Sequence, residues 1–401
     1  MEESAMRITE EQAQHARDLH EQAVVIAAHT DICPDIAKRQ RNGETHVFAR
    51  RHLPVLRRGG LTAVCDHVAG DAPYLIDFPF RNTMATNRLK FALQAIEAMY
   101  IEAESSPDEI GIAISVDDIL AAKRDGRVAI VLCFEGAGPV EDDPSLLDIF
   151  HRLGIRCIGL THNFRNLLAD GVAVGGNNGL TALGREAVRE MNRLGIVVDV
   201  SHMTFQGFWD VIETSTAPVH ASHSSCFDLV DHPRNLTDDM LRALAQTGGV
   251  VGVHPLSVFI TNESRAATFD ELLDHIEHMV EVMGADHVAI GPDIMENFPA
   301  EEYTLLWQDV RLPEYHFVYP EEFDSLAKFP AITAGLVARG CPDETIVKIL
   351  GGNMLRLFST VWSGEKAQRT GQPLRGTFYH ADSRPAPIEQ IASAATQQRS
   401  S

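Results

Sequence analysis

Two histidines stand 21 positions apart, and each follows a serine at the end of a short apolar run: His202 in "DVSHM" and His223 in "ASHSS". Successive side chains of a strand point to opposite faces, so His202 shares a face with Val198 and Val200, and His223 shares one with Ala221. Both imidazoles can therefore face one interior at the same level. Imidazole ligands suit zinc best, and manganese, cobalt or iron are also possible.

Other residues of ligand type occur at similar positions. In "AHTD", His29 and Asp31 are two positions apart at the end of an apolar run, so they face the same side and can share one cation. Glu135 closes the run "VAIVLCFEG", where burying an unpaired carboxylate is costly and where its two oxygens can bridge two metals. His220 has the opposite parity to His223 and is left out. Each residue alone could be a hydrogen-bonded rim residue, but the combination favours ligands.

The charges of this set fit two divalent cations. Asp31, Glu135, Asp293 and a bridging hydroxide would together balance four positive charges. Two metals about 3.5 Å apart generate a nucleophile at neutral pH and polarise a carbonyl. The predicted chemistry is hydrolysis of an amide or ester without a covalent intermediate. No G-x-S-x-G turn indicates a serine nucleophile instead.

Eight short apolar runs must position these residues, and His162, His254 and Asp293 stand at the ends of further runs. The runs are 24–31, 61–68, 128–136, 155–163, 196–202, 218–224, 249–255 and 287–293. Helical patterns follow several of them, at 88–104, 144–154, 181–195, 237–248 and 269–284. This alternation predicts an α/β fold, a closed (β/α)8 TIM-type barrel with functional groups at the carboxyl ends of its strands. A doubly wound open sheet is the alternative, but no G-x-G-x-x-G turn follows the first run.

Composition and charge limit the partners and the compartment. We expect an N-terminal helix in 1–23, a single catalytic barrel in 24–360 and a partly loosely ordered tail in 361–401. A formal net charge of −22 argues against nucleic acid and anionic membranes as partners. The N-terminal segment has no signal-peptide pattern, no apolar run is long enough to span a bilayer, and none of the six cysteines forms a C-x-x-C pair. These features predict a cytoplasmic protein with reduced thiols.

The motifs resemble, in order, those of the renal (membrane) dipeptidase family of zinc peptidases. The resemblance runs from about residue 20 to 360, through "HTD", "CFEGAGPV", "LTHNFRNLLADG", "GLTALGREAVREMNRLGIVVDVSHM", "PVHASHSSC", "HPRNLTDDML", "DHVAIGPD" and "GLVARGCPDETIVKILGGNMLRLF". It implies a barrel of the metallo-dependent hydrolase type, a homodimer, and two Zn²⁺ per chain. His29 and Asp31 would hold one zinc, His202 and His223 the other, and Glu135 would bridge them.

The resemblance also implies roles outside the metal set. His162 in "LTHN" would contact the substrate near the scissile carbonyl. Arg234 in "HPRNLTDD" would bind the substrate's C-terminal carboxylate, which its planar fork matches. Asp293 in "IGPD" would move protons as the acid/base. The implied substrates are dipeptides, among them dipeptides with a D-residue at the C-terminal position.

The chain departs from the family pattern at pocket positions. "DIME" (293–296) stands where D-F-D-G is common, and "HPL" (254–256) stands where N-F-Y is common. We expect the stretch 297–323 to form a wall of the substrate pocket; packing on the barrel rim or a partner subunit is the alternative. This stretch carries Tyr303, Trp307, Tyr315, Phe317 and Tyr319.

Two other functions stay open at this point. The first is a metal-dependent amidohydrolase that acts on another small carboxylate-bearing amide, such as an N-acyl amino acid or a lactam. The second is a barrel that binds a ligand without turnover.

Overall fold

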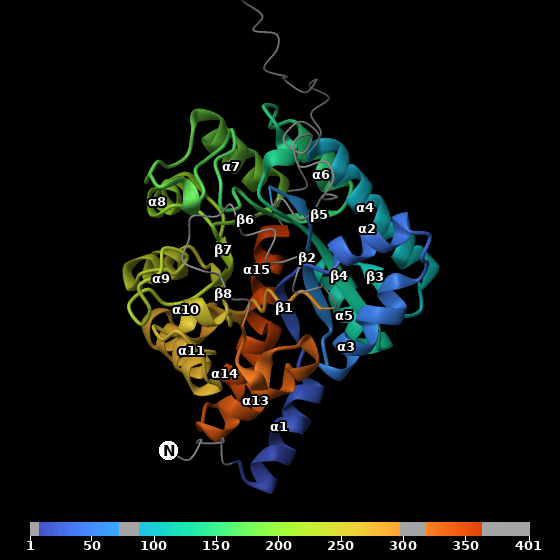
Figure 1. Cartoon of the computed structure of the whole chain (residues 1–401), viewed down its shortest axis with the longest axis vertical. Helices are drawn as coiled ribbons and strands as arrows, with labels where there is room; N and C mark the ends of the chain where they lie inside the picture. Colours follow the sequence, from blue (N-terminus) through green and yellow to red (C-terminus); the bar gives the residue numbers. More distant parts are fainter. Residues whose placement is uncertain (1–7, 72–87, 297–317, 363–401) are drawn as a thin grey trace, which may run out of the picture. The chain divides into compact units, whose positions relative to one another are not determined.

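The structure is a computed structural model that describes residues 8–71, 88–296 and 318–362. Eight parallel strands form a closed ring in the order β1, β2, β4, β5, β6, β7, β8 and β9, and β9 pairs with β1 to close it (Figure 1). The fold is a (β/α)8 TIM-type barrel, as predicted. The strands are β1 (Ile26–Thr30), β2 (Ala63–Gly70), β4 (Val128–Glu135), β5 (Ile155–Gly159), β6 (Val197–Asp199), β7 (Val219–Ser224), β8 (Val250–Val253) and β9 (Val288–Ile290).

Each predicted run overlaps one of these strands, and β2 extends beyond the predicted run 61–68 to Gly70. Every residue of the eight strands is buried, because helices cover the outside of the ring and side chains fill its interior. A strand that is buried on both faces is apolar almost throughout, which explains why the runs could be recognised in the sequence.

One strand has no counterpart among the predicted runs. β3 (Ile110–Ile112) pairs with the start of β4, where Ile110 lies opposite Val128. The opposite edge of β4 pairs with β2, and β5 joins β4 only from Leu132 onward. β3 therefore fills the space beside the start of β4 without entering the ring. Its three residues, with a glycine in the middle, are too few for the pattern to reveal it.

Helices surround the barrel (Figure 1). The five predicted helical patterns correspond to α4 (Arg88–Ser105), α6 (Leu146–Arg152), α7 (Ala182–Leu194), α9 (Asp238–Gln246) and α11 (Phe269–Met283). The other α-helices are α1 (Glu10–Gln22), α2 (Cys33–Arg41), α3 (Leu53–Arg58), α5 (Val116–Asp125), α8 (Phe205–Thr214), α10 (Ser257–Ile260), α13 (Pro330–Ala338), α14 (Asp343–Val347) and α15 (Asn353–Trp362). The described residues also form short helical turns: η1 (Phe48–His52), η4 (Gly138–Val140), η5 (Val172–Val174), η6 (Ala285–His287), η7 (Glu321–Phe323), η8 (Leu326–Lys328) and η9 (Lys348–Gly352).

Local capping sets the limits of these helices. The Thr181 hydroxyl accepts the Gly184 amide at the start of α7, and Gly195 ends that helix at a φ of 75°. α5 and α11 begin with capping boxes. No helix among the described residues is long and apolar enough to cross a membrane. The division into helix, barrel and tail stays a prediction, since the tail beyond Trp362 lies outside the described residues.

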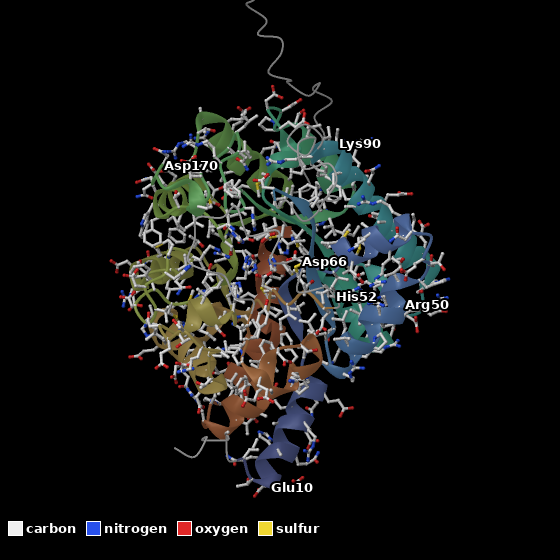
Figure 2. All side chains as sticks on the ribbon, viewed as in Figure 1. Glu10, Arg50, His52, Asp66, Lys90 and Asp170 are labelled. Carbon is white, nitrogen blue, oxygen red and sulfur yellow. The ribbon has the colours of Figure 1, made fainter. Side chains whose placement is uncertain are left out.

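Asp66 of β2, labelled in Figure 2, fixes the end of β1, where the "HTD" motif lies. Its buried carboxylate accepts hydrogen bonds from the amides of Ile32 (2.7 Å) and Cys33 (3.1 Å) and from the Thr30 hydroxyl (3.1 Å). These amides belong to the start of α2, whose dipole also favours a negative charge there. Burial raises the pKa of Asp66 to about 6, although the hydrogen bonds act in the opposite direction. The strand end is therefore held by a buried acid rather than by packing alone.

We expect Asp66→Ala to lower the free energy of unfolding by at least about 2 kcal/mol, because two buried amides lose their acceptor at about 1–3 kcal/mol each. Asp66→Asn should cost less, since one side-chain oxygen can still accept. Urea unfolding at pH 7 measures both changes. The control is Asp142→Ala at an exposed position, which should stay within about 0.5 kcal/mol of the wild type. Equal stability of Asp66→Ala and the control would contradict this role.

Candidate metal centre and active site

The eight predicted site residues all lie in the described part of the chain, at the carboxyl ends of strands or just beyond them. His29 and Asp31 come from the end of β1, Glu135 is the last residue of β4, and His223 lies in β7. The remaining four follow strand ends: His162 after β5, His202 after β6, Arg234 after β7 and Asp293 after β9. Parallel strands of a barrel end on one face, so the residues meet there.

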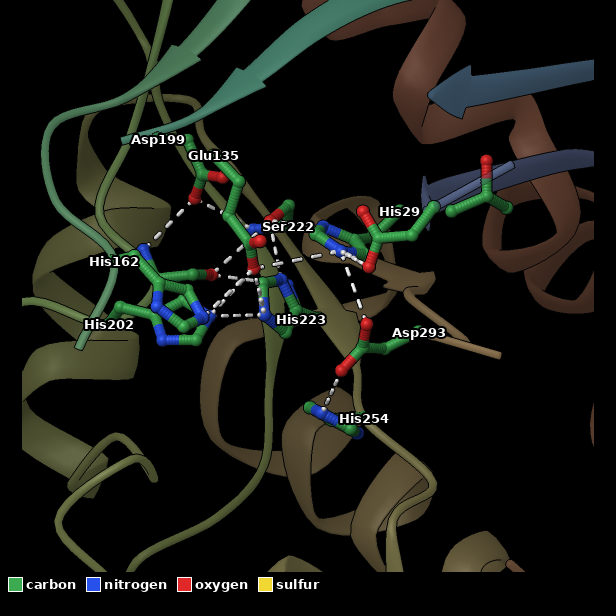
Figure 3. A network of polar contacts seen from close by, with 12 residues as sticks. His29, Glu135, His162, Asp199, His202, Ser222, His223, His254 and Asp293 are labelled. Carbon is green, nitrogen blue, oxygen red and sulfur yellow. Dashed lines mark hydrogen bonds and ion pairs between the residues drawn. The ribbon is translucent and has the colours of Figure 1, made fainter. Parts of the chain in front are cut away.

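Glu135 lies at the centre of this group (Figure 3). Its Oε1 is 3.0 Å from Nε2 of His202 and 3.6 Å from Nε2 of His223. The same oxygen is 3.9 Å from Nε2 of both His29 and His162. All five side chains are almost fully buried. One carboxylate oxygen thus faces four imidazoles that belong to four different strand ends.

A hydrogen bond on the far side of the His202 ring defines its tautomer. His202 Nδ1 is 2.8 Å from the Asn163 carbonyl oxygen Oδ1, which can only accept, so Nδ1 carries the proton and Nε2 is proton-free. His223 Nδ1 is 2.7 Å from the Ser222 hydroxyl, which can donate or accept. The two Nε2 atoms lie 2.8 Å apart, and that of His202 lies 3.0 Å from Glu135 Oε1. The lone pair of His202 Nε2 therefore faces the Glu135 carboxylate, an arrangement that a cation beside them would stabilise.

Electrostatics keep these rings neutral. Burial holds the pKa of His202 well below its usual range, and the Arg234 guanidinium adds to this effect. Burial also lowers the pKa of His223, with a further contribution from His29. Neutral imidazole is the form that binds metals. Glu135, His202 and His223 each offer a ligand atom within 4.8 Å of the others, so this donor set fits a divalent cation.

A second set of donors adjoins the first. His29 Nε2 lies 3.5 Å from Asp31 Oδ2 and 3.3 Å from Asp293 Oδ1. Burial lowers the pKa of His29, but Asp31 and then Asp293 more than offset this, so the pKa lies well above its usual range. Burial raises the pKa of Asp31. The ligand atoms form two further compact groups, one of His29, Asp31 and His67 and one of His29, His223 and Asp293.

Asp293 is held by a histidine to which the sequence pattern assigned no role. The Leu256 amide donates to His254 Nδ1 (3.1 Å), so the proton of this ring is on Nε2, which donates to Asp293 Oδ2 (3.0 Å). Burial alone would raise the pKa of Asp293, but the hydrogen bonds from His254 and His29 hold it well below its usual range. The Tyr319 hydroxyl donates to the Asp293 backbone carbonyl (2.7 Å). The carboxylate is therefore ionised and fixed in orientation.

Backbone conformation reveals strain at two of these positions. β6 ends at Asp199, so His202 does not lie on a strand and the parity argument does not apply to it. It enters the site from a turn, at a φ of 68°, and Asp293 has a φ of 50°. Non-glycine residues with positive φ are uncommon, and they concentrate at functional sites. His202 and Asp293 therefore reach the site through local backbone turns, which the alternation of side chains along a strand cannot predict.

Polar contacts join the ends of β6 and β7. Asp199 Oδ1 accepts the amides of Ser201 (2.9 Å) and Ser222 (3.0 Å), and Ser201 Oγ accepts the amide of His223 (3.1 Å). These groups fix His223 and the turn that carries His202. The serines of the two Ser-His pairs therefore support the histidines that follow them.

Two glycines allow close backbone contacts at the strand ends that carry Glu135 and His223. A Cβ atom on Gly70 would lie 1.9 Å from the Glu135 carbonyl oxygen, and one on Gly291 would lie 2.0 Å from the Ser222 carbonyl oxygen. Only glycine fits at both positions, because there is no space for a Cβ atom. Larger residues would push apart the strand ends that carry Glu135 and His223.

Arg234 is buried beside the centre. Its Nη2 donates to the His223 carbonyl (3.1 Å), and the guanidinium carbon lies 5.6 Å from the centroid of the Phe259 ring. This contact fixes a planar cation next to one of the proposed ligands.

The structure describes only part of the segment after β9 that departs from the family pattern. Met295 is buried, and Glu296 accepts hydrogen bonds from Ser325 Oγ and the Leu326 amide, both at 2.6 Å. Of the aromatic residues in 297–323 that the sequence singled out, Tyr319 is described, and the others lie outside the described residues. The predicted pocket wall thus stays a prediction.

Comparison with known proteins identifies the family. The model of the membrane dipeptidase family, peptidase family M19, matches residues 13–304. The dipeptidase verJ of Clonostachys rogersoniana is 31% identical over 353 residues, which cover 86% of this chain and 80% of the relative. An amidohydrolase structure from Pseudomonas aeruginosa is 27% identical with a TM-score of 0.74, over 87% of this chain and 99% of that chain.

A metallopeptidase structure from Rhodobacter sphaeroides, liganded with a phosphinate mimic of L-Ala-D-Ala, shares the fold with a TM-score of 0.71. It is 23% identical and covers 85% of this chain and 99% of that chain. These findings confirm the resemblance drawn from the motifs. The chain belongs to the membrane dipeptidase family, peptidase family M19, and is a hydrolase of the metallo-dipeptidase class.

Proposed function

We propose that this protein hydrolyses the peptide bond of dipeptides with two zinc ions per chain. His29 and Asp31 hold one ion, His202 and His223 hold the other, and Glu135 bridges the two. One observation carries the proposal: the Nε2 atoms of His202 and His223 lie 2.8 Å apart beside the buried Glu135 carboxylate, whose Oε1 is 3.0 Å from Nε2 of His202. Other divalent metals with a preference for nitrogen and oxygen donors fit the same set.

Residues outside the metal ligands would transfer protons and contact the substrate. When bound, a pair of divalent cations supplies a nucleophile from water at neutral pH and polarises the scissile carbonyl. Asp293 Oδ1 faces His29 and the centre, so it can take a proton there and pass it to the leaving amine. His254 holds the other oxygen of this carboxylate. His162, beside Glu135, contacts the substrate near the carbonyl.

We propose that Arg234 binds the C-terminal carboxylate of the substrate. The Rhodobacter sphaeroides structure with the L-Ala-D-Ala mimic supports a dipeptide with a D-residue at this position as one substrate. The homodimer and the cytoplasmic location remain proposals that rest on the sequence.

A substrate panel tests the proposed function. L-Ala-L-Ala and L-Ala-D-Ala should be cleaved, and N-acetyl-L-alanine should be cleaved slowly or not at all. Preference for N-acetyl-L-alanine would favour the second candidate, an amidohydrolase that acts on N-acyl amino acids, which the amidohydrolase from Pseudomonas aeruginosa brings into consideration. Metal bound without turnover of any compound would favour a ligand-binding barrel.

We expect Glu135→Gln to abolish dipeptide hydrolysis and to lower the metal content from two ions per chain to one or fewer, since a neutral amide cannot balance two cations. Elemental analysis and a dipeptide assay measure these changes. Glu104→Gln, at an exposed position on α4, is the matched control. Near-normal activity with both ions retained would exclude the bridging role.

For Arg234→Ala, we expect kcat/KM for free-acid dipeptides to fall by about 30- to 1000-fold, because a desolvated charged hydrogen bond is lost at about 2–4 kcal/mol. Dipeptide amides, which lack the carboxylate, serve as the internal control. Because Arg234 also contacts the His223 carbonyl, metal content must be measured in the same preparation. An equal loss for acids and amides would show that Arg234 does not bind the carboxylate.

Replacing His254 tests the orientation of Asp293. His254→Leu removes the Nε2–H donor and should lower kcat by about 10- to 100-fold with little change in KM. His254→Gln places an amide donor at a similar distance and should recover part of kcat. Both variants should keep the wild-type metal content. If the two variants have equal kcat values, the hydrogen bond to Asp293 has no positioning role.

A further inference from the structure

One buried histidine near the centre has no hydrogen-bond partner within 8–71, 88–296 and 318–362. His67 of β2 has no exposed surface, and neither of its ring nitrogens has a hydrogen-bond partner among the described residues. A neutral imidazole has one N–H donor and one acceptor. Leaving each buried and unsatisfied costs about 1–3 kcal/mol. Such a ring is expected only where something outside the polypeptide completes it.

Buried histidines elsewhere in the described chain behave differently. His52 Nε2 pairs with Asp35 at 2.9 Å, His220 Nδ1 donates to the Val250 carbonyl at 2.7 Å, and His20 contacts both Thr333 and the Gly59 carbonyl. Each of these three rings therefore has at least one polar partner, whereas both nitrogens of His67 have none among the described residues. His67 departs from this pattern at the point where the metal centre lies.

His67 lies close to the proposed ligands His29 and Asp31. Asp66 points toward the start of α2, so His67, as the next residue of the strand, faces the interior of the barrel. Its ring stacks on that of His29, with centroids 3.9 Å apart and planes at 22°. His67, His29 and Asp31 each offer a ligand atom within 4.8 Å of the others.

A local irregularity separates His67 from regular strand pairing. His67 lies opposite Cys133 of β4, and the register then shifts before Ala69. Bulges of this kind re-aim side chains, often next to active sites. Burial and the neighbouring His29 lower the pKa of His67 well below its usual range, so the ring is neutral.

We propose that His67 is a further protein ligand of the metal that His29 and Asp31 hold. This inference rests on the proposed two-metal function and extends it. With Glu135 as the bridge, the first metal then has two imidazoles and two carboxylates, whereas the second has two imidazoles and the bridge. Four protein ligands complete a tetrahedral site, and three leave an open position. The first ion is therefore the more tightly retained, and the second is the one left open to substrate.

Metal release and cobalt spectroscopy test this assignment without relying on activity. Wild-type protein and His67→Asn are loaded with Zn²⁺, dialysed against graded concentrations of a chelator and analysed for metal. We expect wild-type protein to lose one ion early and one late. His67→Asn should lose the late-released ion about 10- to 100-fold more readily. In Co²⁺-loaded protein, the visible absorption should change in the variant because one ligand of one ion is replaced.

Controls separate this role from a structural one. His220→Asn alters a buried histidine of the same barrel that belongs to none of the compact ligand groups, and it should leave both release steps unchanged. Circular dichroism and urea unfolding check that each variant folds; His67→Gln replaces His67→Asn if the latter does not. Two ions released from the variant as in wild type, with an unchanged Co²⁺ spectrum, would overturn the role of His67 alone. Wild-type protein that binds no metal would overturn the proposed function as well.

Discussion

The buried carboxylate of Glu135 is the constraint on which the rest of the site depends. A carboxylate removed from water costs several kcal/mol unless opposite charge or donors surround it. One of the imidazoles that face it, His202, donates its Nδ1 proton to Asn163. It therefore presents a lone pair to Glu135, not an N–H group. Negative charge and a lone pair converge on one point, an arrangement that a bound cation would stabilise.

The surrounding fold keeps this unfavourable convergence in place. Asp199 ties the ends of β6 and β7 together, and Asp66 anchors the end of β1 to the start of α2. Gly70 allows β2 to approach Glu135 closely. The positive φ of His202 adds local strain that its packed surroundings hold in place. Hydrogen bonds to residues behind the ligands fix the tautomer and the orientation of those ligands, and losing such a bond typically lowers metal affinity about 10- to 100-fold.

Sequence patterns predicted the barrel because strands buried on both faces are apolar almost without interruption. They also placed His29 beside Asp31, although β1 ends at Thr30 and its register shifts between Ala27 and Thr30. His202 was assigned to the site by alternation along a strand that ends before it, so the assignment rested on a rule that does not apply there. His67 lies within an apolar run, where a histidine looks like part of the core. What distinguishes it, the absence of a partner, is a property of three-dimensional packing and leaves no trace in sequence.

Different parts of the barrel carry the residues proposed to hold the first metal and the residues proposed to contact the substrate. His29, Asp31 and His67 belong to β1 and β2 or the residue just beyond, next to the anchored start of α2. Arg234 and Asp293 stand in segments that follow β7 and β9, where the family pattern is altered at "HPL" and "DIME". In a TIM barrel, segments after strands vary while the strands persist. His254, the first residue of "HPL", donates to Asp293 Oδ2 at 3.0 Å, and its ring lies 5.2 Å from that of His223. A substitution at this position therefore acts first on the orientation of the proposed proton-transfer group.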